Sequence, residues 1–177
     1  MDNLERVRTS INFDNTYFRN LVGFYSPVDA DRVPDPNLLC FNHKLGTQLN
    51  LEQEFFDSPE GAQIFSGNLK PDGSQSLSQV YAGHQFGGYS PQLGDGRAVL
   101  LGEVKDVNGE RFDIQLKGSG RTPYSRGGDG KAAIGPVLRE YIISEAMHAL
   151  GIPTTRSLAA VSTGESVYRE ARLPGAV

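Results

Sequence analysis

A short glycine-rich segment, Gly94-Asp95-Gly96-Arg97, is the first stretch of the sequence whose residue types could bind a phosphate group. Two glycines allow a ligand to approach the backbone closely, and the guanidinium beside them could bind a phosphate through two hydrogen bonds. The alternative is an ordinary turn that carries an exposed arginine, because a Gly-x-Gly pattern alone is a weak signal. The hypothesis therefore requires further charged residues near this segment.

Two such residues follow in the chain. Lys117 ends a predicted strand, where protein-kinase-like folds carry a lysine that contacts nucleotide phosphates. Glu140 follows on a predicted helix and could reach back to hold the lysine ammonium. Glu145 is a rival partner on the same helix, and Glu140 is favoured because it lies nearer the helix start. The alternative is a solvated lysine and an acid that is stabilised only by the helix dipole.

The stretch between these two residues, 118–135, is rich in glycine and basic side chains. Arg121 and Arg126 could line an anionic pocket, and Asp129-Gly130 could contact a nucleotide. The alternative interpretation is a mobile polar loop. The three histidines of the chain are not spaced as metal ligands and have no paired nucleophile, so we expect them to be structural or surface residues.

A strand hairpin followed by a helix must position these residues. Residues 97–104 form an apolar run typical of a strand, and Asn108-Gly109 indicates a tight turn. The run that ends at Lys117 alternates apolar and polar side chains, with the lysine on the polar face. A helix is predicted from Gly135-Pro136 to about Leu150.

Two further elements are predicted with less direct bearing on chemistry. Ser58 is a candidate N-cap for a short helix that Gly67 would end. After the long helix, a second hairpin is predicted, with strands at 157–161 and 166–171 joined by a turn at 162–165. The long helix itself carries one broad apolar arc, formed by Leu138, Ile142, Ile143, Ala146, Met147, Ala149 and Leu150.

Composition narrows the class of protein. The chain has 177 residues, the size of one domain, and a net charge of −4, which argues against binding to nucleic-acid backbones. The single cysteine, Cys40, excludes an intrachain disulfide and a multi-cysteine zinc site. No apolar stretch is long enough to span a membrane, and residues 1–6 oppose a signal peptide. We therefore expect a cytoplasmic protein that binds neither nucleic acid nor membrane.

The order of the elements is that of a protein-kinase small lobe: glycine-rich turn, strand, hairpin, strand lysine, helix with a glutamate, then two strands. We predict an α+β fold in which residues 81–177 form this lobe, with an antiparallel sheet packed on one main helix. Residues 1–80 are predicted to be an N-terminal extension that packs on it. The loop between Lys117 and the helix is longer and more basic than in ordinary kinases.

Two long motifs resemble the signatures of the selenoprotein O family. They are YAGHQFGGYSPQLGDGR at 81–97 and QLKGSGRTPYSR at 115–126, and the second continues through DGKAA at 129–133 into Arg139-Glu140. The resemblance covers essentially the whole chain. It implies a kinase-like protein, formerly classed as a pseudokinase, that binds ATP in a flipped orientation. Such a protein transfers AMP, rather than phosphate, to Ser, Thr or Tyr hydroxyls of proteins.

The resemblance also implies a set of nucleotide-binding residues and a divalent metal, Mg²⁺ or Mn²⁺. AMP transfer requires that negative charge be stabilised at the α-phosphate and at the departing pyrophosphate, which positioned cations and a metal accomplish. The positions that match the family's nucleotide contacts are Gly94, Gly96, Arg97, Lys117, Asp129 and Gly130, with Glu140 as the acid that orients Lys117.

The chain departs from the family pattern in what it lacks. Family members are far longer, and their catalytic Asp and metal-binding Asn and Asp correspond to no position up to Val177. We therefore expect an N-terminal part without the large lobe, which does not catalyse the reaction by itself. The alternatives are a non-catalytic ATP-binding regulatory module and a protein kinase that transfers the γ-phosphate.

Overall fold

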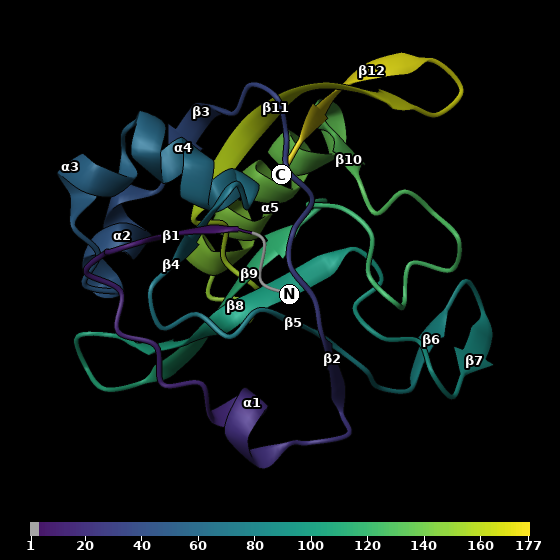
Figure 1. Ribbon diagram of the computed structural model, residues 1–177, viewed down its shortest axis with the longest axis horizontal. Coiled ribbons are helices and arrows are strands. Elements are labelled where there is room, and N and C mark those ends of the chain that lie inside the picture. The colour runs from purple at the N-terminus through teal and green to yellow at the C-terminus, as the bar shows by residue number, and fades with distance from the viewer. Residues whose placement is uncertain (1–3) are drawn as a thin grey trace.

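Two four-stranded antiparallel sheets organise the protein, whose computed structural model describes residues 4–177. Figure 1 shows their arrangement with the helices. The first sheet has the order β2 (Tyr25–Pro27), β5 (Leu77–Gln79), β8 (Ala98–Lys105), β9 (Arg111–Lys117). The second has the order β10 (Ala132–Ala133), β12 (Arg172–Ala176), β11 (Ala159–Tyr168), β3 (Asn37–Phe41).

Two short strand pairs and five helices complete the described part of the chain. The pairs are β1 (Glu5–Val7) with β4 (Leu69–Pro71), which is parallel, and β6 (Gly83–Gln85) with β7 (Gly88–Ser90), which is antiparallel. The helices are α1 (Thr16–Asn20), α2 (His43–Gln48), α3 (Gln53–Phe56), α4 (Pro59–Ser66) and α5 (Ile134–Ala149). Antiparallel sheets with few helices agree with the predicted α+β class. The first three residues, part of the segment that opposes a signal peptide, lie outside the described residues.

The hairpin of β8 and β9 confirms the prediction made from its alternating pattern. The strands pair in antiparallel register from Ala98 opposite Lys117 to Lys105 opposite Arg111. The apolar side chains of β9 face the core, and its polar side chains, Lys117 among them, are exposed. The turn forms at Asn108-Gly109, as predicted.

The core lies against one face of this hairpin, and α4 contributes much of it. The Ser58 hydroxyl accepts a hydrogen bond from the Gly61 N–H, and Gly67 ends the helix in a left-handed conformation, as predicted. Five residues of α4 are buried, and Ile64 is only 1% exposed. The core cluster includes Phe41, Leu45, Phe56, Ile64, Phe65, Leu101, Val104, Ile114, Leu116 and Val161.

The long helix α5 packs on β11 and β12, yet no residue along its described length is fully buried. It spans nearly the predicted residues. Its apolar arc is largely exposed: the exposed fraction is 64% for Ile142, 54% for Ile143 and 74% for Leu150. The arc predicted from the sequence therefore exists on the helix, but folding of the described residues does not cover it.

The second predicted hairpin is placed wrongly. The structure has one strand, β11, through the expected turn at 162–165, and the chain reverses later, where the Arg169 N–H bonds the Ala171 carbonyl. Gly164 has a left-handed φ of 72° within an irregularity of the β11–β12 register, so it forms a bulge rather than a turn. A glycine that serves a bulge and one that serves a turn look alike in sequence.

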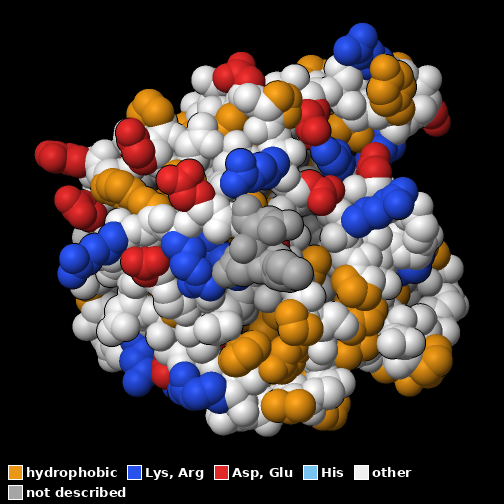
Figure 2. All heavy atoms as spheres, in the orientation of Figure 1, with side chains coloured by type: hydrophobic (Ala, Val, Ile, Leu, Met, Phe, Trp, Pro, Cys, Tyr) orange, Lys and Arg blue, Asp and Glu red, His pale blue; other side chains and the backbone are white. Residues whose placement is uncertain are grey.

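The first 80 residues supply strands to both large sheets. β3 pairs with β11, and β2 and β5 join β8 in the other sheet. Hydrophobic side chains also gather on the surface over α1 and the start of β2, in the lower part of Figure 2. Between α1 and β2, Val22 and Phe24 have exposed fractions of 77% and 59%. Among residues 4–177, no helix has both the length and the apolarity to cross a bilayer.

Candidate functional site

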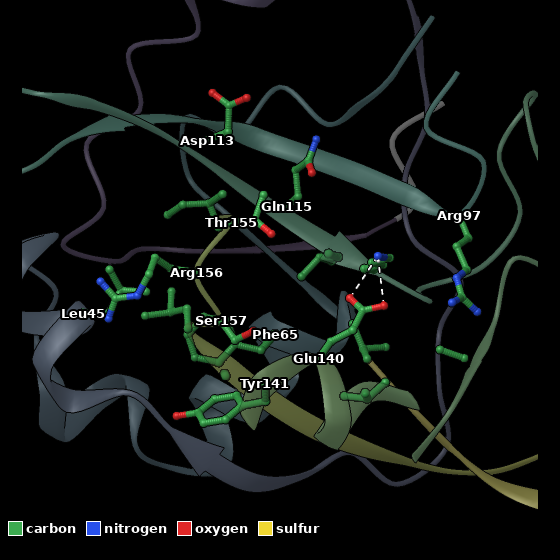
Figure 3. A pocket seen from close by; sticks show the side chains of 18 of the residues that line it. Leu45, Phe65, Arg97, Asp113, Gln115, Glu140, Tyr141, Thr155, Arg156 and Ser157 are labelled. Carbon is green, nitrogen blue, oxygen red and sulfur yellow. Dashed lines mark hydrogen bonds and ion pairs between the residues drawn. The ribbon is translucent and has the colours of Figure 1, made fainter. Parts of the chain in front are cut away.

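A cavity of about 430 Å³ opens between β9, the start of α5 and the segment 155–159. Figure 3 shows the side chains that line it. Three of the predicted site residues, Arg97, Lys117 and Glu140, line this one cavity. The remainder of the wall is mostly apolar, with Leu45, Leu49, Phe65, Leu116, Val137 and Val177 among its residues. The cavity thus combines an apolar wall with a charged end.

Lys117 and Glu140 form the contact that the predicted orienting role requires. The lysine Nζ donates to both carboxylate oxygens of Glu140, at 3.1 and 2.9 Å, and Figure 3 shows the glutamate pointing from α5 to the strand lysine. Both side chains are about half exposed, at 55% and 52%. An exposed pair of this kind contributes at most about 1 kcal/mol to stability. Its main effect is therefore to fix the position of the ammonium.

The rival acid on α5 has another partner. Arg156 donates from Nε and from Nη2 to the two carboxylate oxygens of Glu145, each at 2.6 Å. The hydrogen bonds from Arg156 lower the pKa of the Glu145 carboxyl, although partial burial opposes this. The choice of Glu140 over Glu145 is thus confirmed as a choice of contact.

The glycine-rich turn at 94–96 is tied to the loop between β9 and β10. The hydroxyls of Thr122 and Ser125 both donate to the Gly96 carbonyl, each at 2.6 Å. The Tyr124 ring packs so closely on Gly94 that a side chain there would collide with it. The turn at 94–96 and the loop segment at 122–125, which are separate in the sequence, are therefore held against each other next to Arg97.

Arg97 connects this structure to the far end of the loop, because its Nη1 donates to the Lys131 carbonyl at 3.1 Å. The same carbonyl accepts from Arg169 Nη2 at 2.9 Å. Arg169 also binds both carboxylate oxygens of Asp129, at 2.8 and 3.0 Å. The Arg169 guanidinium lowers the pKa of the Asp129 carboxyl, which is therefore ionised at neutral pH.

Asp129 and Gly130 are not part of the cavity wall. They lie where the loop meets the β11–β12 hairpin, and a side chain at Gly130 would collide with the Gly120 backbone. The structure thus brings Arg97, Lys117 and Glu140 together, places Gly94 and Gly96 beside Arg97, and links Asp129 and Gly130 to them through Lys131. Whether any of these residues contacts a nucleotide stays a prediction.

The hairpin contacts of this loop could not be predicted from the sequence. Besides Arg169, Glu165 of β11 accepts two hydrogen bonds from Lys131 Nζ, at 2.7 and 2.5 Å. These partners are 40 and 34 residues from the loop residues they bind. No local pattern marks them, and the hairpin that carries them was predicted in the wrong register.

The acids near the site differ in their tendency to ionise. Burial raises the pKa of Asp95, which sits between the two glycines and accepts a hydrogen bond from the Gln79 N–H at 2.9 Å. Burial also raises the pKa of Asp113 on β9. Within residues 4–177, no three His, Cys, Asp or Glu side chains converge as metal ligands.

Comparison with known proteins gives one family. The family described as "Protein adenylyltransferase SelO" matches residues 7–177 of this chain. This match covers nearly all of the chain, and it agrees with the resemblance that the motifs indicate.

Curated relatives carry a related name. Proteins named "Protein nucleotidyltransferase YdiU" are 62% identical in Nitrobacter hamburgensis and 60% identical in Rhizobium meliloti, over 94% and 96% of this chain. The relative of that name from Anoxybacillus flavithermus is 62% identical over 94% of the chain. The matched part is only 33% of the first relative and 34% of the other two, so the chain spans about a third of their length.

Proposed function

Because the chain belongs to the protein adenylyltransferase SelO family, we propose that it is the nucleotide-binding part of an enzyme that transfers AMP from ATP to Ser, Thr or Tyr hydroxyls of proteins. The observation that carries this proposal is the Lys117–Glu140 pair beside Arg97 at the charged end of one cavity. The proposal includes the kinase-like small lobe that the element order predicts.

The residues of the chain have distinct roles in this proposal. Arg97 and Lys117 bind phosphate oxygens of ATP, and Glu140 holds the Lys117 ammonium in place. Fixed cations stabilise the charge that develops on the phosphates, because they need no reorganisation during the reaction. Gly94 and Gly96 provide backbone without side chains, which a phosphate can approach closely.

The loop end that carries Asp129 and Gly130 is proposed to contact the nucleotide as well. Arg169 neutralises the Asp129 carboxylate, so this end of the loop does not repel the phosphates. The Mg²⁺ or Mn²⁺ that such a reaction uses would supply positive charge to compensate the phosphates. The described residues supply no set of metal ligands, so we assign none of them to the metal.

A second function is favoured by the lack of a metal-ligand cluster among the described residues. The described residues contain no cluster of three metal-ligating side chains, and the chain spans about a third of its relatives, so by itself it would act as a non-catalytic ATP-binding module. The two functions share the nucleotide site and differ in whether AMP is transferred. An experiment must therefore measure ATP binding and AMP transfer separately.

Binding is tested first, by titration of ATP with Mg²⁺ into the protein and into Lys117→Ala and Lys105→Ala. We expect Lys117→Ala to weaken ATP binding about tenfold or more, because a charge-assisted hydrogen bond to phosphate is lost. Lys105→Ala is the matched control, since Lys105 lies at the other end of the same hairpin and is similarly exposed, at 58%. Equal ATP affinity in the Lys117→Ala protein would contradict the assigned site.

Transfer is tested in a hybrid chain in which these residues replace the matched part of the Nitrobacter hamburgensis relative. With an acceptor protein and ATP, mass spectrometry distinguishes an added AMP from an added phosphate. AMP on hydroxyl residues, absent with Lys117→Ala, supports the proposal. Added phosphate would indicate a kinase, and ATP binding without any addition would support the non-catalytic module.

A further inference from the structure

Three cationic side chains around the 118–131 loop are each paired with a carboxylate. Each of them binds a carboxylate through two hydrogen bonds that are 3.1 Å or shorter. These pairs are Lys117–Glu140, Lys131–Glu165 and Arg169–Asp129. Apart from Lys117, which lines the cavity, these cations hold the loop and the β11–β12 hairpin together.

The guanidinium groups of three arginines in the same region form hydrogen bonds only with neutral oxygen atoms within the described part of the chain. They are Arg97, Arg121 and Arg126, and their hydrogen bonds measure 3.1, 2.9 and 2.9 Å. The acceptors are the carbonyls of Lys131 and Gly128 and the side-chain oxygen of Gln85. A guanidinium has five N–H donors, so most donors of each arginine are available to an anion.

Arg126 lies where the proposed phosphate site needs a cation. A side-chain carbon built on Gly96 would come within 3.8 Å of the Arg126 Nη2. The adjacent Ser125 hydroxyl is bonded to the Gly96 carbonyl at 2.6 Å, which holds the arginine over this glycine. On the other side, Gln85 of the β6 strand accepts from Arg126 Nη1 and orients the guanidinium.

The backbone at Arg126 has an unfavourable conformation. Its φ of 51° is in the left-handed region, which residues other than glycine seldom adopt. Such conformations cost free energy and persist where the surrounding structure requires them, often at functional sites. Arg126 and Gly127, with φ values of 51° and 77°, are the central residues of a turn that the Gly128 N–H closes on the Ser125 carbonyl at 2.8 Å. This turn accounts for the conformation and presents the exposed Arg126 side chain, which forms no ion pair among the described residues.

We propose that Arg126 is a second phosphate-binding arginine, which binds the polyphosphate of the nucleotide over Gly96 beside Arg97. This inference rests on the proposed nucleotide site and extends it to a residue outside the cavity wall. The ligand chemistry is that of a polyphosphate anion. Arg126 is thereby distinguished from Arg121, whose guanidinium is bonded within its own loop.

The experiment measures binding of ATP, inorganic tripolyphosphate and adenosine to the protein and to Arg126→Gln. We expect Arg126→Gln to weaken binding of ATP and of tripolyphosphate about tenfold, since one charge-assisted contact is lost, and to leave adenosine binding unchanged. The matched control is Arg172→Gln, which removes another exposed arginine, one that donates to the Ser166 hydroxyl in the β11–β12 hairpin. Thermal unfolding of each variant verifies that it is folded, and Arg126→Lys should recover part of the affinity.

The outcomes separate this inference from the proposed function. If Arg126→Gln binds both anions as tightly as the unaltered protein, the Arg126 assignment is wrong, and a loss with Lys117→Ala still supports the nucleotide site. If tripolyphosphate binding depends on Arg126 but ATP binds no more tightly than tripolyphosphate and Lys117→Ala has no effect, the anion site stands and the proposed nucleotide site falls. No binding of either anion by the unaltered protein would overturn both.

Discussion

The helices α4 and α5 represent two different uses of an apolar helix face. In α4, five of eight residues are buried, and both ends are closed, by the Ser58 side chain and by a left-handed Gly67. In α5, which is twice as long, no residue is fully buried and no side chain caps the N-terminus at Ala133. The apolar residues of α4 thus stabilise the fold, whereas those of α5 remain largely accessible.

This difference indicates that α4 contributes more to the stability of the fold than α5 does. α4 packs on β3, β4 and β11, and its buried side chains share one core with Leu116, the residue before Lys117 on β9. α5 supplies Glu140 from a helix whose packing against the rest is incomplete. One partner of the Lys117–Glu140 pair is therefore held rigidly, while the other is on an element whose position is less restricted by the core.

The largest effect is expected from a matched pair of isoleucines on the two helices. Ile64 of α4 is 1% exposed and Ile142 of α5 is 64% exposed. We expect Ile64→Ala to lower the free energy of unfolding by about 2–5 kcal/mol, because it leaves a cavity in the core. Ile142→Ala should change it by less than about 0.5 kcal/mol. Urea denaturation measures both, and similar losses for the two variants would show that α5 is as essential to the core as α4.

An intermediate effect is expected at the start of α4. Ser58→Ala removes the side-chain acceptor of the Gly61 N–H and should lower the free energy of unfolding by about 1 kcal/mol. The same denaturation experiment measures it, with Ser58→Asp as a control that restores a capping oxygen. Equal losses for Ala and Asp would mean that the cap is not what the serine contributes.

The smallest effect is expected from the surface ion pair between Arg169 and Asp129. Arg169 lowers the pKa of Asp129 below its ordinary 3.8. A lowered pKa stabilises the folded state at pH values above 3.8, and this contribution disappears as the pH falls through the lower value in the folded protein.

Arg169→Ala should therefore cost less than about 1 kcal/mol at pH 7, since the pair is exposed, and still less below pH 3.8. Denaturation at both pH values measures the difference, and Arg172→Ala is the control. A loss that is the same at both pH values would attribute the role of Arg169 to its bond with the Lys131 carbonyl rather than to charge.

Local patterns in the sequence predicted those elements whose residues are close in the chain. The β8–β9 hairpin follows from alternation and from Asn108-Gly109, and α4 from Ser58 and Gly67. The contact between Lys117 and Glu140 was predicted from the order of the elements and from the place of Glu140 near the helix start, although α5 packs mainly on β10, β11 and β12.

The features that the sequence did not predict depend on residues that are far apart in the chain, or on a glycine that could serve either a turn or a bulge. The pairing of β3 with β11 joins residues such as Phe41 and Ala159, and no local signal specifies such a register. Glycine is common both in turns and in bulges, so the sequence around Gly164 does not distinguish the predicted turn from the bulge that forms. The contacts of Asp129 with Arg169 depend on that misplaced hairpin, so they could not be derived either.

The Gly96 carbonyl receives two hydroxyl donors, from Thr122 and from Ser125, and this duplication has a genetic consequence. Loss of one donor leaves the oxygen satisfied by the other, so a scan of single substitutions would understate how much this junction depends on the two hydroxyls. Only the combined loss would uncouple the two glycine-bearing segments, and the double variant would be worse than the two singles together. The junction is thus robust to one change and fragile to two.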